Sequence, residues 1–101
     1  MIKNFKKIIK MKKIQQFYDE PVEMTWHEVM EKYENHPKWK LPTRNELIAM
    51  YKSNMDSFES DFYWSSSEYY DSFAWGVDFD DGGTYSLYKY DAGRVRVIHA
   101  F

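Results

Sequence analysis

The sequence predicts an α+β domain in which two early helices pack on a twisted antiparallel sheet. Apolar residues recur at helical spacing between residues 24 and 52, and from Phe62 onward they alternate as in strands. Segments that contain Asp and Gly separate the alternating stretches and predict turns. Helices grouped before a run of strands are typical of the α+β class.

The length and composition bound the number of domains. A chain of 101 residues with 44% hydrophobic content is sized for one modest core, and we expect a single domain over residues 14–101. Residues 1–13 form a lysine-rich extension that we expect to be disordered. Because Met11 would serve as a start of its own, we expect residues 1–10 to be dispensable. The alternative is a basic amphipathic helix, with Ile2, Phe5 and Ile9 on one face.

A short first strand is expected over Ile14–Phe17, followed by a helix within residues 24–35. Thr25 can cap this helix, and Glu28, three residues later, completes a capping box, while Met24 can pack on Val29. The spacing of four apolar residues places one face in the core: Trp26, Val29, Met30 and Tyr33.

The second expected helix lies within residues 41–52 and repeats the same device. Thr43 is the cap and Glu46 returns the capping bond, while Pro42 prevents an earlier start. Three apolar residues are expected to face inward: Leu47, Ile48 and Tyr51. Residues 53–61 are polar and acidic without a clear period and predict a loop.

A meander is expected from Phe62 to the end of the chain. Trp75, Val77 and Phe79 alternate into the core, whereas Ala74, Gly76 and Asp78 point the other way. DDGG at residues 80–83 predicts a hairpin turn before a strand over 84–90. DAG at residues 91–93 predicts a second turn, and the strand over 94–101 has Val95 and Val97 on one face.

Charge is distributed unevenly along the chain. Residues 1–14 hold six lysines, which leaves eight basic against sixteen acidic residues afterwards. Residues 53–88 contain neither Lys nor Arg, although eight acidic residues lie there: Asp56, Glu59, Asp61, Glu68, Asp71, Asp78, Asp80 and Asp81. Such a charge distribution repels nucleic acid and favours basic partners, or it serves only to keep the surface soluble.

The absence of cysteine excludes disulfides, zinc–thiolate sites and cysteine nucleophiles. The sequence shows neither a signal peptide nor a membrane span, and we expect a soluble, cytoplasmic protein.

Four segments resemble the C-terminal domain of the Legionella collagen-like protein, a bacterial and phage domain of the C-type-lectin-like superfamily: MTWHEVMEKYE, WKLPTRNEL, FYWSSSEYYDSFAWGVDFDDGG and RVRVIHAF. The resemblance covers about residues 24–98. It implies a C-type-lectin-like fold with adjacent N- and C-terminal strands. Lys40 stands where the family usually has Arg, and Ile98 and His99 replace its usual ending. The residues that match the family's structural motif are Trp26, Trp39, Leu41, Pro42, Thr43, Arg44, Glu46, Trp64, Ser65, Trp75 and Phe79.

The sequence offers little support for catalysis or metal binding. Ser65, Ser66 and Ser67 have no histidine at a recognised spacing, and we expect their hydroxyls to satisfy backbone groups. His27 with Glu31 lacks a further zinc ligand, and Gly82 occupies a ligand position of the calcium-loop pattern. The sugar-binding calcium motifs of the superfamily are also missing. We expect no enzymatic activity, no metal and no cofactor.

Recognition remains as the expected activity, because so many aromatic residues exceed what one small core can hold. Exposed tyrosines are efficient contact residues. The expected partner-binding residues are Tyr69, Tyr70, Asp71, Phe73, Asp80, Asp81, Tyr85, Tyr88 and Tyr90. The segment Glu68–Phe73 is expected to be a variable loop and the centre of the function.

We therefore expect a non-catalytic module that binds a protein, without direct contact to nucleic acid or membrane. The narrower hypothesis is a small phage or mobile-element accessory protein whose acidic, tyrosine-rich face enters the nucleic-acid groove of a basic host defence nuclease and inhibits it. The alternative is a structural or adhesive module of a surface or virion, which binds glycans or host proteins.

Overall fold

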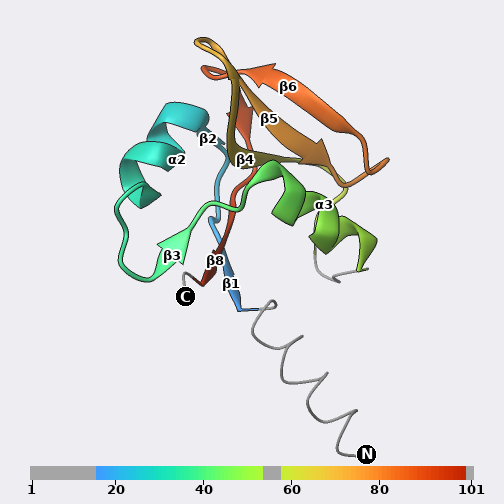
Figure 1. Ribbon diagram of the computed structural model, residues 1–101, viewed down its shortest axis with the longest axis horizontal. Helices are drawn as coiled ribbons and strands as arrows, with labels where there is room; N and C mark the ends of the chain where they lie inside the picture. The colour runs from blue at the N-terminus through green and yellow to red at the C-terminus, as the bar shows by residue number, and fades with distance from the viewer. Residues whose placement is uncertain (1–15, 54–57, 100–101) are drawn as a thin grey trace, which may run out of the picture.

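The computed structural model describes residues 16–53 and 58–99 and is shown in Figure 1. The predicted extension over residues 1–13, Ile14 of the first predicted strand, and Asp56 lie outside the described residues. The helices and strands, in chain order, are β1 (Phe17–Asp19), β2 (Met24–Thr25), α2 (Trp26–Tyr33), β3 (Trp39–Lys40), α3 (Arg44–Lys52), β4 (Phe62–Tyr70), β5 (Phe73–Asp78), β6 (Thr84–Tyr88), β7 (Ala92–Gly93) and β8 (Arg96–His99).

The described strands form three antiparallel sheets, so the predicted α+β class is confirmed. Their orders are β1-β8-β3, β2-β7 and β4-β5-β6. The first and last strands are adjacent, as the family resemblance implied: Phe17 lies opposite Ile98 and Asp19 opposite Arg96. Figure 1 shows this pair running side by side away from the larger sheet.

Both helices begin where the sequence predicted, at capping boxes. Thr25 Oγ1 accepts from the Glu28 backbone N–H at 3.3 Å, and the Glu28 carboxylate accepts from the Thr25 N–H at 2.8 Å. Thr43 and Glu46 exchange the same two bonds at 3.2 and 2.8 Å. Each box satisfies amide groups that a helix start leaves unpaired, so the local sequence sets both starts.

The sheet β4-β5-β6 is covered on both faces, which the alternation alone did not reveal. One face contributes Phe62, Trp64 and Ala74 to a core that also holds Trp26 and Val29 of α2. The other face contributes Tyr63 and Val77 to a second core with Leu47 and Met50 of α3. Ala74 and Gly76, expected to point away from the core, are therefore buried.

Trp75 corrects the prediction that it alternates into the core with Val77. It lies on the α3 side of β5 but belongs to neither core cluster, because the Arg44 guanidinium covers its ring at 4.9 Å. Val77 is fully buried, and Phe79 packs against the α3 core from the turn that follows β5.

In α3, the prediction that Tyr51 faces inward is wrong. Met50, the residue before it, faces the core and is buried. Tyr51 is exposed and packs the edge of its ring on Phe79 at 5.5 Å. Leu47 is fully buried and Ile48 is partly buried against the same cluster, as expected. Leu47 and Met50 are three residues apart, so they share one helix face.

Several strand boundaries also differ from the prediction. The first described strand is β1 at Phe17–Asp19. Glu68–Tyr70 continues β4 and is not a loop, so that only residues 71 and 72 form the turn. β6 ends at Tyr88, and the predicted DAG turn contains β7, which pairs with Met24 and Thr25. The last strand begins later than predicted, at Arg96, although Val95 and Val97 are both buried as expected.

The hairpin turn predicted at DDGG is confirmed. Residues 79–81 form the turn between β5 and β6, and Gly82 has a φ of 75°. A side chain at this φ would be strained, and a Cβ here would also collide with the Tyr51 ring.

Candidate functional site

All six aromatic residues predicted to contact a partner are exposed. Their exposed fractions run from 40% for Phe73 to 70% for Tyr70. The set is Tyr69, Tyr70, Phe73, Tyr85, Tyr88 and Tyr90. Exposed aromatic rings that cluster are unusual on a soluble domain and commonly indicate an interaction site.

Five of these rings, with Trp75, gather around the β4–β5 hairpin, and we call this group the aromatic surface: Tyr69, Tyr70, Phe73, Trp75, Tyr88 and Tyr90. One run of contacts joins Trp75 to Tyr69 at 4.9 Å and Tyr69 to Tyr70 at 5.6 Å. The other joins Phe73 to Tyr88 at 5.9 Å and Tyr88 to Tyr90 at 5.2 Å.

Strand register holds the two runs together. Tyr70 lies opposite Phe73 across the hairpin, and Phe73 lies opposite Tyr88 across the next pair of strands. The second run continues to α2, because Tyr90 contacts the His27 ring at 5.1 Å. The aromatic surface is therefore positioned by a paired sheet and a helix start, and not by the variable loop that the sequence predicted.

Lys89 fixes the aromatic surface to its surroundings. Its backbone N–H donates to Ser72 O at 2.8 Å in the hairpin turn, and its carbonyl accepts from the Trp26 N–H at 3.0 Å. Its side chain is 3% exposed, and its ammonium lies 2.8 Å from a Glu68 carboxylate oxygen and 4.4 Å from the Trp26 ring centroid. One lysine thus joins the hairpin turn, β4 and α2.

The remaining predicted contact residues lie at the other end of the sheet. Asp80, Asp81 and Tyr85 surround the β5–β6 turn, whereas Asp71 lies in the β4–β5 turn. The two turns are separated by the length of β5, about 20 Å for six residues at about 3.3 Å each. The structure therefore divides the predicted site into two regions at opposite ends of β5 and β6.

The β5–β6 turn uses its acidic side chains locally. Asp78 accepts from the Asp80 N–H at 2.9 Å, and Asp81 accepts from the Gly83 N–H and the Tyr85 hydroxyl, both at 2.7 Å. These two bonds hold the pKa of Asp81 below its ordinary value, and the nearby carboxylate raises the pKa of Tyr85.

The stretch without Lys or Arg is not an unopposed acidic face. Arg94 donates to Asp61 at 2.9 Å, and Lys89 pairs with Glu68. Both cations come from outside residues 53–88 and fold back against them. Asp71 and Asp80 are exposed, at opposite ends of the sheet.

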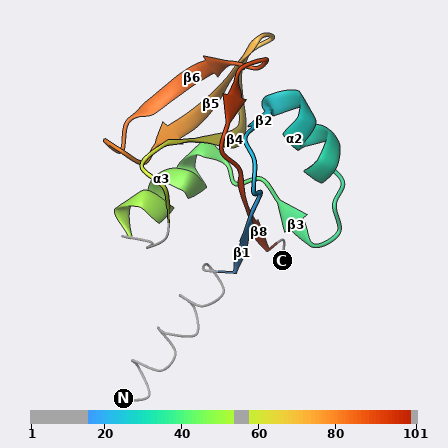
Figure 2. The same cartoon turned by 180° about the vertical axis from the view of Figure 1, so that it is seen from behind.

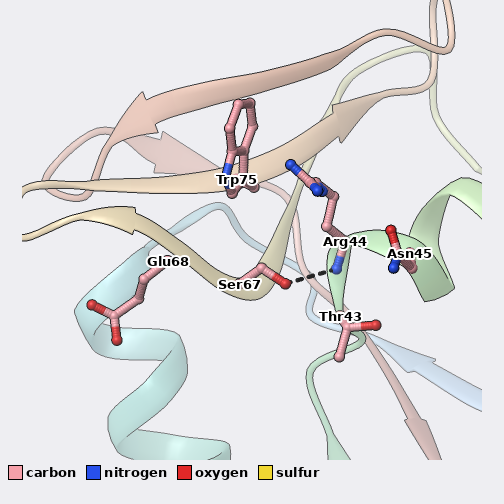
Figure 3. A pocket seen from close by; sticks show the side chains of 6 residues that line it. All are labelled: Thr43, Arg44, Asn45, Ser67, Glu68 and Trp75. Carbon is pink, nitrogen blue, oxygen red and sulfur yellow. Dashed lines mark hydrogen bonds between the residues drawn. The ribbon is translucent and has the colours of Figure 1, made fainter.

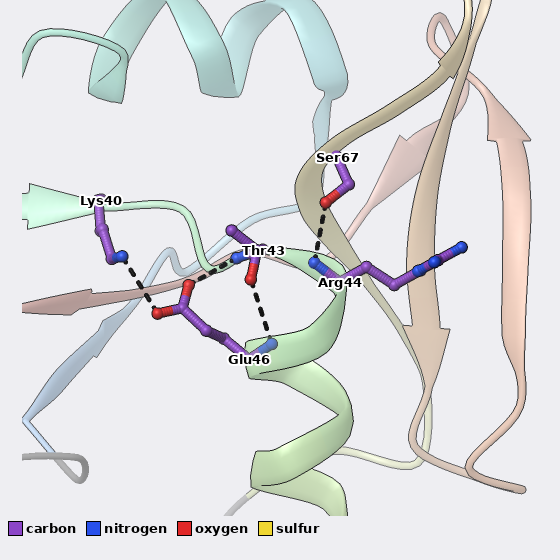
Figure 4. A network of polar contacts seen from close by, with 5 residues as sticks. All are labelled: Lys40, Thr43, Arg44, Glu46 and Ser67. Carbon is purple, nitrogen blue, oxygen red and sulfur yellow. Dashed lines mark hydrogen bonds and ion pairs between the residues drawn. The ribbon is translucent and has the colours of Figure 1, made fainter.

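Beside the aromatic surface lies a pocket of about 180 Å³ lined by Thr43, Arg44, Asn45, Ser67, Glu68 and Trp75, drawn in Figure 3. Ser67 Oγ accepts from the Arg44 backbone N–H at 3.0 Å, which ties the start of α3 to β4. Figure 4 shows the neighbouring network, in which Lys40 donates to the capping carboxylate of Glu46 at 3.1 Å. Lys40, which stands where the family resemblance predicted Arg, thus bonds to the carboxylate of the helix cap.

The other motif residues serve the framework. The indole N–H of Trp26 donates to Ser65 O at 2.8 Å, and that of Trp64 donates to Met24 O at 2.9 Å. Leu41 and Pro42 are buried, and Trp39 packs the edge of its ring on His99 at 5.8 Å. These residues were predicted from the family resemblance, and in the structure they lie in the framework of the domain.

Ser65 and Ser67 behave as predicted, because their hydroxyls bond to backbone groups. Ser65 is fully buried, its hydroxyl donates to Trp75 O at 2.6 Å and it accepts from the Ser67 N–H at 3.1 Å. Across residues 16–53 and 58–99, no group of three or more His, Asp and Glu side chains could hold a metal ion. Over the same residues, no helix is long and apolar enough to cross a membrane.

These features define a small α+β domain that presents a cluster of aromatic side chains beside one hairpin. The family model described as "Lcl C-terminal domain" matches residues 7–99, and the chain belongs to this family. The predicted family resemblance is thereby confirmed, over a longer region than residues 24–98. Among curated proteins no match to the chain was found.

Proposed function

We propose that this domain is a non-catalytic binding module whose contact surface is the aromatic surface around the β4–β5 hairpin. The observation that carries the proposal is the clustering of exposed rings on a rigid, strand-paired hairpin. Rigid aromatic side chains bury a large area at low entropic cost, and the energetic centres of protein interfaces are enriched in Tyr and Trp.

The partner that fits this surface is a protein with Lys or Arg side chains. Asp71 and Asp91, both exposed, lie in the turns next to Phe73 and Tyr90. Aromatic faces attract cations, and neighbouring carboxylates add to that attraction. The narrower prediction, that the domain enters the nucleic-acid groove of a host nuclease, rests on the acidic composition. Because the acidic residues lie at two opposite ends of the sheet, this prediction is tested by two separate charge reversals, one of Asp71 and one of Asp80 with Asp81.

The C-type-lectin-like fold and a cytoplasmic location belong to the same proposal. The adjacency of β1 and β8 supports the fold, together with two helices that precede the larger sheet. A phage or mobile-element origin stays a prediction from size and composition.

Affinity capture from the native host with mass spectrometry tests the binding function. Tyr70→Ala and Tyr88→Ala should each weaken capture of the partner by about tenfold or more, since a buried tyrosine contact contributes about 1.4 kcal/mol or more. Tyr18→Ala is the matched control, because Tyr18 is 46% exposed but lies on β1. Equal capture by all three variants would overturn the proposal, and specific binding on a glycan array would favour the adhesive alternative.

A further inference from the structure

β6 is an edge strand with one unpaired side. It lies at the end of the order β4-β5-β6, and among the strands that the structure describes it pairs only with β5. Both views in Figures 1 and 2 draw it at the outer margin of the sheet. The opposite edge is different, because β4 bonds to other segments through Trp64 N–H to Arg94 O at 3.0 Å and Ser66 N–H to Pro42 O at 2.9 Å.

The register identifies which backbone groups of β6 point outward. Asp78 N–H donates to Gly83 O at 2.9 Å and Lys89 N–H donates to Ser72 O at 2.8 Å. Bonded pairs alternate along an antiparallel ladder, so Tyr85 and Leu87 bond to β5, while Thr84, Ser86 and Tyr88 direct their backbone groups away from it. Among the described residues, nothing bonds to the N–H or C=O of Thr84 or Ser86, whereas the C=O of Tyr88 accepts from the Asp91 N–H at 2.9 Å.

This edge lacks the features that normally prevent pairing. Natural edge strands are commonly protected by charged side chains, proline or bulges. The sequence of β6, TYSLY, contains no charge and no proline, and its register with β5 is unbroken. Tyr, Thr and Leu also fit a pleated, half-buried surface.

We propose that a protein partner adds an extended segment of about five residues to the free edge of β6, and this rests on the proposed binding function. Such a segment spans both halves of the divided site, because β6 runs from the Asp81–Tyr85 end to the Phe73–Tyr88 end. Backbone bonds would supply sequence-independent affinity, and Tyr85 and Tyr88 would contact side chains on alternate faces.

The charges near the edge specify the chemistry of the segment. Asp80 and Asp81 flank one end of β6, Asp71 and Asp91 flank the other, and the adjacent cation Lys89 is buried in its pair with Glu68. A segment with Lys or Arg near its ends complements this distribution. A second copy of β6 would bring acidic ends together and fits less well.

Selection of a displayed library of short random peptides on the full chain tests the proposal. Enriched peptides should carry Lys or Arg, and their affinity should fall at least about tenfold for Ser86→Pro, which removes an outward N–H. Ser86→Ala keeps that N–H and should bind within about twofold of wild type. Thermal unfolding checks that both variants fold, and bound peptide should slow amide exchange at Ser86 and leave Leu87 unchanged.

Three outcomes overturn the proposal: no enriched peptide, equal peptide affinity for Ser86→Pro and Ser86→Ala, or a dimer of this chain that Ser86→Pro abolishes. The last would assign the edge to a second copy. If Tyr70→Ala and Tyr88→Ala lose the native partner while Ser86→Pro retains it, strand addition fails and the aromatic surface stands.

Discussion

The ammonium of Lys89 lies 2.8 Å from the carboxylate of Glu68, and the lysine side chain is 3% exposed whereas that of Glu68 is 58% exposed. The residue that ends the long stretch without Lys or Arg therefore folds back and neutralises one of its acids. The same lysine contacts the Trp26 ring, so a buried cation joins β4 to α2, and in the chain it stands between Tyr88 and Tyr90 of the aromatic surface.

Removal of the acid should destabilise the domain more than removal of the lysine. Glu68→Ala leaves a buried ammonium without its carboxylate, and we expect a loss of about 1–3 kcal/mol in the free energy of unfolding. Lys89→Met keeps the packing on Trp26 and should cost about 1 kcal/mol. Chemical denaturation measures the stability of both variants, and Glu59→Ala, at an exposed position, is a control whose loss should be near zero. A larger loss for Lys89→Met than for Glu68→Ala would contradict this account.

Gly76 should be intolerant of even one added methyl group. A Cβ there would overlap the Phe62 ring and the backbone carbonyl of Tyr63, neither of which can move without disturbing β4. We expect Gly76→Ala to cost about 2 kcal/mol or more. Gly83→Ala is the control: the atoms nearest to its added Cβ belong to the exposed Tyr85 ring, so we expect a smaller loss of stability than for Gly76→Ala. Similar unfolding midpoints for the two variants would show that the β4–β5 packing is looser than described.

The capping box at α3 should make stability depend on pH in the acid range. Burial raises the pKa of Glu46, but the Thr43 N–H and the Lys40 ammonium outweigh burial and hold that pKa below its ordinary value of 4.5. A carboxyl with a depressed folded pKa stabilises above its unfolded pKa and loses this contribution as pH falls through the folded pKa. Between pH 6 and about pH 3, wild type should therefore lose more stability than Glu46→Gln. Urea denaturation measures the free energy of unfolding of both proteins across this pH range, and an equal loss in wild type and Glu46→Gln would refute the prediction.

The β1–β8 pair should depend on one charged contact. Arg96 is fully buried, donates to both oxygens of Asp19 at 2.6 and 2.8 Å, and has Phe17 and Phe58 each 3.7 Å from its guanidinium. Asp19→Asn should cost about 3 kcal/mol, because it weakens the partner of a buried charge. Asp71→Asn, in an exposed turn, is the control and should change the midpoint of thermal unfolding little. If Asp19→Asn unfolds at the wild-type midpoint, the β1–β8 pair does not depend on this contact.

Local signals predicted the starts of both helices and the β5–β6 hairpin well. The Thr and Glu pairs of both capping boxes act within four residues, and the DDGG turn needs only its own backbone freedom. The exposed aromatic residues were predicted because the chain contains more aromatic side chains than one small core can bury. That argument does not depend on the topology of the fold.

Features that depend on long-range contacts were missed. Trp75 lies outside the core because Arg44, distant in sequence, covers it. Burial of Ala74 and Gly76 required knowing that α2 covers one face of the sheet and α3 the other. The division of the site at opposite ends of β5 follows only from the strand register. The pairing of Lys89 with Glu68 depends on the folding of the sheet, in which the Lys89 N–H bonds to Ser72 O in the β4–β5 turn.

Hydrogen exchange of the domain bound to its captured partner tests the central claim most directly. We predict that partner binding slows amide exchange in residues 68–73 and 84–91, which carry the aromatic surface and β6. The helix α3 beyond its first turn, residues 47–52, should be unchanged. Slower exchange confined to α3 or to β1 and β8, with no change at the hairpin, would contradict the account.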